Sequence, residues 1–306
     1  AFHDEGPAHA VFLLRGHVAE RCTFPIPLAV LRHISSPQPL FAEFSFGGMA
    51  LAHNGNLTNA YTLRDELIQD GAIFQSTSDT EAIIHLIARS NADTVAKRVV
   101  YALQQIKGAY SLIAMAKDAM IGVRDPLGVR PLVLGKLGAD SWVLASESCA
   151  LDIIGAELIR DIEPGEMVMI SDKGLESSFP FADRQDRFCV FEYIYFARPD
   201  SYIAGRNVYE SRRAIGAELA NENPAEADVV VPVPDSGLPA AIGYAAQAKL
   251  PFELGIIRNH YVGRTFIEPT DQVRHLGVKL KHNANIATIK GKRVVLVDDS
   301  IVQIGR

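Results

Sequence analysis

Hydrophobic positions change their spacing several times along the chain, and each spacing predicts a different element. FAEFSFGGMALAHNGN, residues 41–56, predicts two short strands joined at Gly47-Gly48. LTNAYTLRDELIQDG, residues 57–71, has helical spacing and stops at a glycine. Residues 76–90 and 95–108 repeat the helical spacing, and Ser78 followed by Glu81 predicts a capping box at the start of the second helix.

Strand patterns replace the helices in the next part of the chain. Turns rich in Gly, Asp and Pro separate five strands, at residues 109–118, 119–125, 130–137, 141–148 and 165–172. The polar, mixed-charge segment 176–188 is the expected linker between two domains. Strand and helix patterns then alternate, which predicts a parallel sheet covered by helices, at residues 228–234, 238–250, 252–258 and 292–299.

The bulk composition fits an ordinary globular protein of about two domains. The 306 residues are 48% hydrophobic and 22% charged. A net charge of −6 argues against a broad nucleic-acid-binding surface. No apolar run reaches the roughly 18–20 residues that span a bilayer. From the charge we expect no nucleic-acid partner, and from the length of the apolar runs we expect no membrane partner. Three cysteines are too few for a disulfide framework, which favours a cytoplasmic protein.

The main candidate for chemistry is VVLVDDSIV, residues 294–302, a strand that reads as fully buried and ends on Asp298 and Asp299. Ligands of open parallel sheets bind beyond the carboxyl ends of the strands. Adjacent carboxylates repel each other unless a cation or hydroxyl donors offset the repulsion, and carboxylate oxygens suit Mg²⁺. A second strand ends at the small turn around Ser236, where N–H groups before a helix suit a phosphate. The combination favours a phosphosugar site, although acidic pairs at strand ends are often only solvated turn residues.

The same stretch resembles the phosphoribosylpyrophosphate (PRPP) fingerprint of phosphoribosyltransferases. FEYIYFARPDS, YVGRTFIEPT and RHLGVKLKHNAN further resemble the glutamine-dependent PRPP amidotransferases, also called amidophosphoribosyltransferases, over about residues 41–302. The resemblance implies that Asp298 and Asp299 bind Mg²⁺ and the ribose hydroxyls. It also implies that Ser236 lies in the pyrophosphate loop and touches the metal.

The basic segment IIRNHYVGRTF, between the two strands, reads as a mobile cover because it holds two arginines and a glycine. The family resemblance implies that Arg258, Tyr261 and Arg264 belong to a loop that closes over PRPP. Arg258 stands where the family has a lysine.

Asn54 and Gly55, in HNGN, are candidates for stabilising a tetrahedral oxyanion, because an Asn side-chain N–H and a Gly backbone N–H could be aimed together. The dipeptide alone is better explained as a hairpin turn. HNGNLTN followed by TSDTE, however, resembles class II glutamine amidotransferases of the N-terminal-nucleophile type. That resemblance implies that Asn54 and Gly55 form the oxyanion hole and that Asp79 binds the α-ammonium of glutamine. Asp79 is also a favourable first-turn helix residue.

The chain departs from this family in three places. The family nucleophile is an N-terminal cysteine, whereas this chain begins AFHDEG and Cys22 is internal. The family has an Arg-Tyr-Ser-Thr segment where residues 17–38 differ, and we hypothesise that this interval is aberrant through a shift of reading frame. After DDSIV the family continues Arg-Gly-Thr-Thr, where this chain has residues 303–306 and stops. We therefore expect a sequence truncated at both ends.

Cys189 matches a cluster-ligand position in the subgroup of the family that binds a [4Fe–4S] cluster. Such a cluster needs three further cysteines, which would have to lie beyond Arg306. A buried structural thiol explains Cys189 at least as well.

The expected fold class combines α+β and α/β parts. An N-terminal-nucleophile αββα sandwich, residues 1–180, precedes a partial type I phosphoribosyltransferase α/β domain, residues 181–306. The resemblance implies glutamine-dependent amination of PRPP to 5-phosphoribosylamine, with Mg²⁺ as cofactor and a homo-oligomeric assembly. Two alternatives stay open: an inactive fragment that keeps at most ligand binding, and another class II amidotransferase such as a sugar-phosphate aminating synthase. A synthase of that kind should lack VVLVDDS, and an asparagine-synthetase-like ligase would need a Ser-Gly-Gly loop that the sequence lacks.

Overall fold

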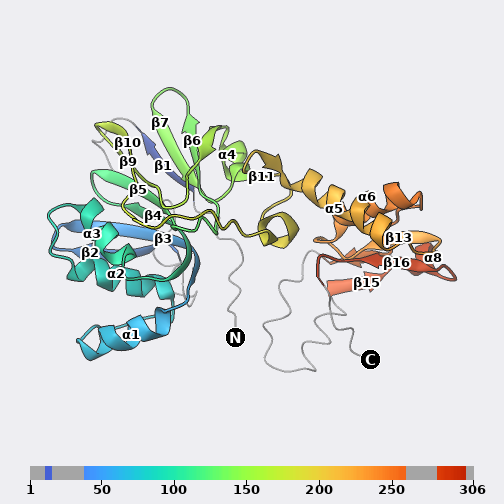
Figure 1. Cartoon of the computed structure of the whole chain (residues 1–306), viewed down its shortest axis with the longest axis horizontal. Coiled ribbons are helices and arrows are strands. Elements are labelled where there is room, and N and C mark those ends of the chain that lie inside the picture. The colour runs from blue at the N-terminus through green and yellow to red at the C-terminus, as the bar shows by residue number, and fades with distance from the viewer. Residues whose placement is uncertain (1–10, 16–37, 260–280, 301–306) are drawn as a thin grey trace. The chain divides into compact units, whose positions relative to one another are not determined.

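The structure, a computed structural model, describes residues 11–15, 38–259 and 281–300 (Figure 1). The chain divides into two compact units. Unit 1 comprises Ala1–Val190 and Tyr202–Ala204, and unit 2 comprises Phe191–Ser201 and Gly205–Arg306. In the part of the chain that the structure describes, no helix combines the length and the apolar character needed to cross a membrane.

Unit 1 contains two antiparallel sheets, with strand orders β10-β9-β5-β4-β3-β2 and β1-β7-β6-β8. Its strands are β1 Val11–Arg15, β2 Leu40–Phe44, β3 Gly47–Leu57, β4 Gly108–Met115, β5 Ala119–Arg124, β6 Val133–Leu137, β7 Ser141–Ala145, β8 Glu157–Asp161, β9 Met167–Ser171, β10 Gly174–Ser178 and β11 Tyr202–Ile203. Its helices are α1 Ala60–Gln69, α2 Asp79–Arg89, α3 Val95–Leu103 and α4 Ser148–Ile154.

Three apolar clusters divide unit 1 into four layers. Helices α1 to α3 pack on one face of the six-stranded sheet. The other face of that sheet packs against the four-stranded sheet. Helix α4 covers the outer face of the four-stranded sheet. Unit 1 is therefore layered as helices, sheet, sheet and helix.

The alternation of side chains along β3 and β4 explains how one sheet serves two cores. Leu51 and Leu112 point into the helix-covered cluster, whereas their neighbours Ala52 and Ile113 point between the sheets. Successive strand residues face opposite sides, so a sheet buried on both faces needs apolar residues in both registers.

Several predicted boundaries differ from the structure. The turn between β2 and β3 is Ser45-Phe46, because Phe44 pairs with Gly47. The capping box is wrong: the Ser78 hydroxyl caps no backbone N–H among the described residues. The Glu81 carboxylate instead accepts from the N–H groups of Gln75 (2.6 Å) and Ser76 (2.8 Å) and closes the loop before α2.

The expected linker also differs, because residues 176–178 belong to β10 and pair with β9. The two units divide later, after Val190.

Unit 2 contains a π-helix, Glu192–Phe196, and two longer helices that pack closely together, α5 Val208–Glu222 and α6 Leu238–Ala248. A Cβ on Gly216 would lie 1.9 Å from the carbonyl oxygen of Ala240, so only glycine permits this approach. The remaining elements are β12 Arg206–Asn207, β13 Val229–Pro232, β14 Ile256–Arg258, β15 His282–Ala284, α8 Ile286–Ile289 and β16 Val294–Val297.

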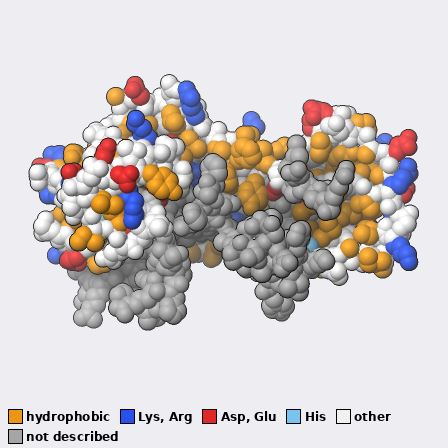
Figure 2. All heavy atoms as spheres, turned by 90° about the horizontal axis from the view of Figure 1, so that it is seen from below, with side chains coloured by type: hydrophobic (Ala, Val, Ile, Leu, Met, Phe, Trp, Pro, Cys, Tyr) orange, Lys and Arg blue, Asp and Glu red, His pale blue; other side chains and the backbone are white. Residues whose placement is uncertain are grey.

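Strands β13 and β16 pair in parallel, with Val229 opposite Val294 and Pro232 opposite Val297. The predicted parallel sheet is confirmed for this pair. The prediction that residues 294–297 are fully buried is wrong, because Val294 is 40% exposed and Leu296 is 48% exposed. Alternation turns Val295 and Val297 toward α5 and α6 and the other two residues to the opposite face. Figure 2 shows apolar side chains on the surface of this part of the chain.

Candidate functional site

Asn54 and Gly55 lie within β3, in the part that pairs with β4. Asn54 is opposite Ser111, and Gly55 is opposite Tyr110. The strand continues to Leu57, so the hairpin interpretation of Asn-Gly is wrong. Asn54 is half-buried and Gly55 is exposed, which leaves both accessible to a small molecule at this edge of the β3–β4 pair.

The absence of a side chain at Gly55 is a requirement of the strand pairing. A Cβ there would lie 2.0 Å from the carbonyl oxygen of Ala109 and 2.8 Å from Nε2 of His53. Both contacts are closer than real Cβ atoms tolerate, and Ala109 contributes backbone that cannot move aside. Gly55 is therefore needed because the backbone of β4 passes close to it, and not because HNGN forms a turn.

Asp79, the first residue of α2, is tied to the same segment of β3. Its carboxylate accepts the N–H of Leu57 at 3.0 Å and lies 3.4 Å from Nδ1 of His53. Burial raises the pKa of Asp79, but the hydrogen bond and charge of His53 and the N–H groups of Leu57 and Thr80 outweigh burial, and the pKa lies below its ordinary value. Asp79 is thus a carboxylate held ionised against His53 and Leu57, the residues of β3 that flank the segment with Asn54 and Gly55.

Arg130 is a residue of this site that the sequence reasoning missed. Its Nη2 donates to Oδ1 of Asn54 at 2.9 Å, across 76 positions of sequence. Arg130 follows a loop in which the Asp125 carboxylate accepts several backbone N–H groups. The turn residues of DPLGVR are visible in the sequence, but nothing in their spacing points to Asn54.

In unit 2 the parallel pairing of β13 and β16 brings Ser236 and Asp298 together. Val233 donates its N–H to the carbonyl oxygen of Val297 at 2.8 Å, which extends the pairing to the ends of both strands. The turn that holds Ser236 lies against Asp298, because a Cβ on the next residue, Gly237, would lie 3.2 Å from the Cα of Asp298. A Cβ on Gly237 would lie 2.3 Å from the carbonyl oxygen of Val297, so this glycine allows the turn to approach β16.

The acidic pair lies in a partly desolvated position. Burial raises the pKa of Asp298, and the charge of Asp299 raises it further, against the lowering effects of the Asp299 N–H and the Ser236 side chain. The Asp299 N–H donates to Oδ1 of Asp298 at 2.8 Å. Oδ2 of Asp299 is buried and lacks a hydrogen-bond partner among residues 38–259 and 281–300. A free carboxylate oxygen, a second carboxylate and a hydroxyl fit the oxygen ligands that Mg²⁺ prefers.

Arg258 also faces the turn after β13. Its guanidinium forms an ion pair with Asp235, beside Ser236. Arg258 lines a cavity of about 470 Å³ together with Asn259 and Asn283. Tyr261 and Arg264, which the family resemblance places in the same covering loop, lie outside the described residues.

The iron–sulfur interpretation of Cys189 stays a prediction, because it places the other three ligands beyond Arg306. Cys189 is half-buried, and the other described cysteine, Cys149, is buried with its Sγ 3.9 Å from Glu147. A [4Fe–4S] cluster takes four thiolates, and the chain has three cysteines in all. Within residues 38–259 and 281–300, no group of three or more His, Cys, Asp or Glu side chains is arranged to hold a metal ion.

Comparison with known proteins relates both units to one family. Residues 27–152 match the glutamine amidotransferase domain family. An amidophosphoribosyltransferase of Rhizobium etli is 58% identical over 271 residues, which cover 87% of this chain and 54% of that protein. A chloroplastic amidophosphoribosyltransferase of Glycine max is 49% identical over 271 residues, covering 88% of this chain and 48% of that protein.

A solved structure gives the same relationship in three dimensions. The glutamine PRPP amidotransferase of B. subtilis, complexed with ADP and GMP, matches with a TM-score of 0.79 and 49% identity, over 87% of this chain and 58% of that chain. The predicted fold class is thereby confirmed: an N-terminal-nucleophile αββα sandwich followed by phosphoribosyltransferase α/β structure. The chain spans about half the length of the curated relatives it matches. By sequence and by fold, it belongs to the amidophosphoribosyltransferase family.

Proposed function

We propose that the protein catalyses the glutamine-dependent amination of PRPP, which yields 5-phosphoribosylamine, glutamate and pyrophosphate, the first committed step of de novo purine synthesis. The observation that carries the proposal is the parallel pairing of β13 and β16, which continues through the 2.8 Å hydrogen bond from the Val233 N–H to the Val297 carbonyl oxygen and puts the turn at Ser236 beside Asp298. In a chain of this family, that juxtaposition supports a grip on a magnesium-bound sugar diphosphate at the carboxyl ends of parallel strands.

Residues 1–180 supply the glutaminase half of the proposed reaction. In the family the thiolate of an N-terminal cysteine attacks the amide carbon of glutamine, whereas the sequence here begins with Ala1. Asn54 and Gly55 donate N–H groups to the oxyanion that this attack forms. Asp79 binds the α-ammonium of glutamine, and its lowered pKa supports that role because the carboxylate stays negative throughout the neutral range.

Residues 181–306 supply the PRPP half. Asp298, Asp299 and Ser236 would hold Mg²⁺, which when bound neutralises the charge of the leaving pyrophosphate. The two carboxylates also accept from the ribose hydroxyls. Arg258 exchanges Asp235 for a phosphate group of PRPP, and Tyr261 and Arg264 complete the cover over the substrate.

The proposed assembly is a homo-oligomer. Several large apolar side chains are exposed in unit 2, including Leu254 at 49% and Ile286 at 60%. Such side chains suit burial against another chain, although single exposed apolar residues are common. Light scattering on the purified protein tests this: a monomeric mass at micromolar concentration contradicts it.

Two assays on the purified chain test the proposed reaction. The first measures glutamate release from glutamine, and the second measures pyrophosphate release from PRPP with ammonium chloride and Mg²⁺. Ammonia-dependent formation of phosphoribosylamine supports the proposal. A chain that binds PRPP but turns over neither substrate is the inactive fragment, and amination of a hexose phosphate instead of PRPP identifies a sugar-phosphate aminating synthase.

A further inference from the structure

Arg130 contacts the proposed oxyanion donor directly, through the 2.9 Å hydrogen bond from its Nη2 to Oδ1 of Asn54. We propose that Arg130 is a positioning residue that fixes the side-chain amide of Asn54 with its NH₂ group free to donate to the oxyanion. The inference rests on the proposed glutaminase function and adds to it a residue outside the HNGN and TSDTE motifs.

The chemistry of the two side chains decides which end of the amide faces Arg130. A guanidinium carries only donors, so it pairs with the oxygen of an amide and repels the NH₂ group. An Asn side chain alone is ambiguous, since its oxygen and nitrogen differ little in shape. The contact with Arg130 removes that ambiguity. The NH₂ group of Asn54 is then the end left to donate to a bound substrate.

Arg130 is held in place by side chains from two paired strands, Arg124 on β5 and Ser111 on β4. Its carbonyl oxygen accepts from Nε of Arg124 at 2.8 Å, and the Ser111 hydroxyl donates to the carbonyl oxygen of the next residue, Pro131, at 2.7 Å while lying 3.3 Å from that of Arg130. Ser111 is the residue opposite Asn54 in the β3–β4 pairing. The hydroxyl of Ser111 thus links β4, the strand that pairs with Asn54, to the backbone of Arg130 and Pro131.

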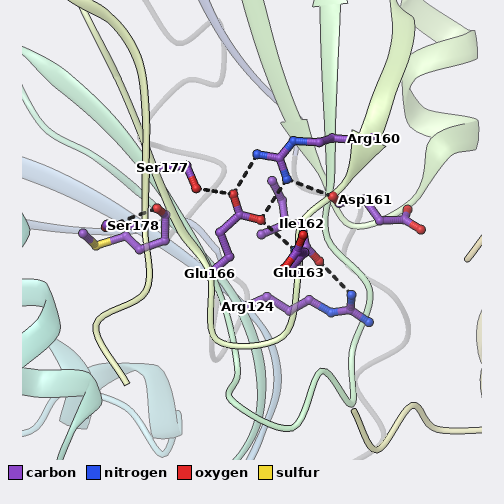
Figure 3. A network of polar contacts seen from close by, with 9 residues as sticks. Arg124, Arg160, Asp161, Ile162, Glu163, Glu166, Ser177 and Ser178 are labelled. Atoms are coloured by element: carbon purple, nitrogen blue, oxygen red, sulfur yellow. Dashed lines mark hydrogen bonds and ion pairs between the residues drawn. The ribbon is translucent and has the colours of Figure 1, made fainter. Parts of the chain in front are cut away.

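Buried polar groups fix the loop that leads to Arg130. Arg124 is 8% exposed and donates to the carbonyl oxygens of Gly128 (2.8 Å) and Ile162 (2.7 Å), the second of which is drawn in Figure 3. Asp125 is fully buried and accepts the N–H groups of Leu127 at 2.9 Å and Val129 at 3.0 Å. A guanidinium delivered by a loop with so many satisfied bonds has little freedom to leave Asn54.

Without Arg130, we expect the side-chain amide of Asn54 to rotate so that its oxygen and its NH₂ group exchange places. An inverted Asn54 presents its oxygen to a developing negative charge, so stabilisation is lost in the transition state rather than in substrate binding. Loss of a whole oxyanion donor costs ~10²–10³ in kcat. If Asn54 presents its NH₂ group for only part of the time, kcat should fall less than this, by about 10- to 100-fold.

Three substitutions separate orientation from packing. Lysine also carries only donors, so Arg130→Lys should keep most of kcat for glutamine hydrolysis. Glutamine carries both a donor and an acceptor, so Arg130→Gln should lower kcat about 10- to 100-fold with a smaller change in KM. In Arg130→Met, which has no hydrogen-bonding group at this position, kcat should fall at least as far as in Arg130→Gln. The matched control is Arg89→Gln, because Arg89 pairs with Asp70 near the surface, and this variant should keep the parent kcat.

An NMR measurement decides the inference without requiring turnover. In chain labelled with ¹⁵N-asparagine, the side-chain NH₂ signals of Asn54 are assigned by their loss in Asn54→Ser. We expect these signals to shift and to exchange faster with water in Arg130→Gln and Arg130→Met, but to stay close to the parent in Arg130→Lys. Unchanged Asn54 signals in Arg130→Met, or equal kcat in the Lys, Gln and Met variants, overturn the inference. Lack of glutaminase turnover in the parent chain identifies the inactive fragment and bears only on the proposed function, while the NMR result still decides the role of Arg130.

Discussion

At the scale of single residues, Gly55 combines a backbone constraint with a proposed chemical role. We expect Gly55→Ala to destabilise unit 1 by at least about 1–3 kcal/mol, because the new methyl group overlaps the carbonyl of Ala109 and forces β3 away from β4. Glutaminase activity should fall with it. Urea unfolding of the variant and the parent measures the change in free energy.

Gly48 provides the control for this substitution in the same strand. A Cβ on Gly48 would lie 2.8 Å from the ring end of Phe41, a side chain that is 69% exposed and can turn away. Gly48→Ala should therefore cost clearly less than Gly55→Ala. Equal losses of stability in the two variants would mean that the approach of Ala109 does not limit position 55.

Asp79 makes the stability of unit 1 depend on pH in a defined direction. Its pKa is lower in the folded chain than the ordinary 3.8, so its contribution is present above about pH 4 and is lost as pH falls through the folded pKa. Asp79→Asn should lower the free energy of unfolding by about 1–3 kcal/mol near pH 7. The difference between parent and variant should shrink toward pH 3, as urea midpoints at the two pH values will report. A constant difference contradicts the assignment.

Single residues also show where sequence reasoning succeeds and where it stops. HNGN and TSDTE point to Asn54, Gly55 and Asp79, and the fold brings β3 and α2 together as those motifs require. The hairpin interpretation of Asn-Gly failed because strand pairing with β4 overrides the turn preference of the dipeptide. Arg130 could not be found, because a contact across 76 positions depends on the path of the loop and not on local spacing.

At the scale of elements, Glu166 joins the two sheets of unit 1. Its carboxylate accepts from both terminal nitrogens of Arg160 on β8, at 2.7 and 2.8 Å, and from the Ser177 hydroxyl on β10 at 2.6 Å (Figure 3). Burial raises the pKa of Glu166, but Arg160, Ser177 and the Glu163 N–H outweigh it, so the pKa lies below its ordinary value. A buried charge is therefore satisfied by groups from two different sheets.

We expect the stability lost with Arg160 to come mainly from the Glu166 charge that is left without its cation. Arg160→Met leaves the carboxylate buried and unpaired, which costs about 3–5 kcal/mol in buried pairs, with the lower end expected because Arg160 is 38% exposed. The double variant Arg160→Met/Glu166→Gln removes the charge and should recover part of that loss. Thermal unfolding of the four proteins in the cycle measures this. A double variant no more stable than Arg160→Met would show that the unpaired charge is not the cause.

Elements were predicted well where periodicity is strong and poorly where tertiary contacts decide. The helical spacing at residues 79–89 and the apolar strand at residues 229–232 both gave elements in the expected places. The capping box failed because Glu81 bonds to Gln75 and Ser76 instead. Burial of β16 was overestimated because an apolar run does not reveal whether both faces of a strand are covered.

At the scale of the whole molecule, the two compact units carry the two proposed half-reactions in separate sets of residues. Asp79 belongs to unit 1, and Asp298 and Ser236 belong to unit 2. The proposed chemistry of each unit uses its own substrate, glutamine in one and PRPP in the other. Substitutions should therefore separate the two activities instead of lowering both together.

The separation is expected to work in both directions. Asp298→Asn removes one carboxylate of the proposed metal site and should lower ammonia-dependent amination of PRPP by at least about 10- to 100-fold. Losses of that size follow the substitution of residues that only support metal ligands. The release of glutamate from glutamine should persist in that variant. Asp79→Asn should do the reverse, because ammonium supplied in solution bypasses the glutaminase site. Parallel assays of both activities check this pair, and a variant that loses both equally, while remaining folded by circular dichroism, would show that the units do not act as separate catalysts.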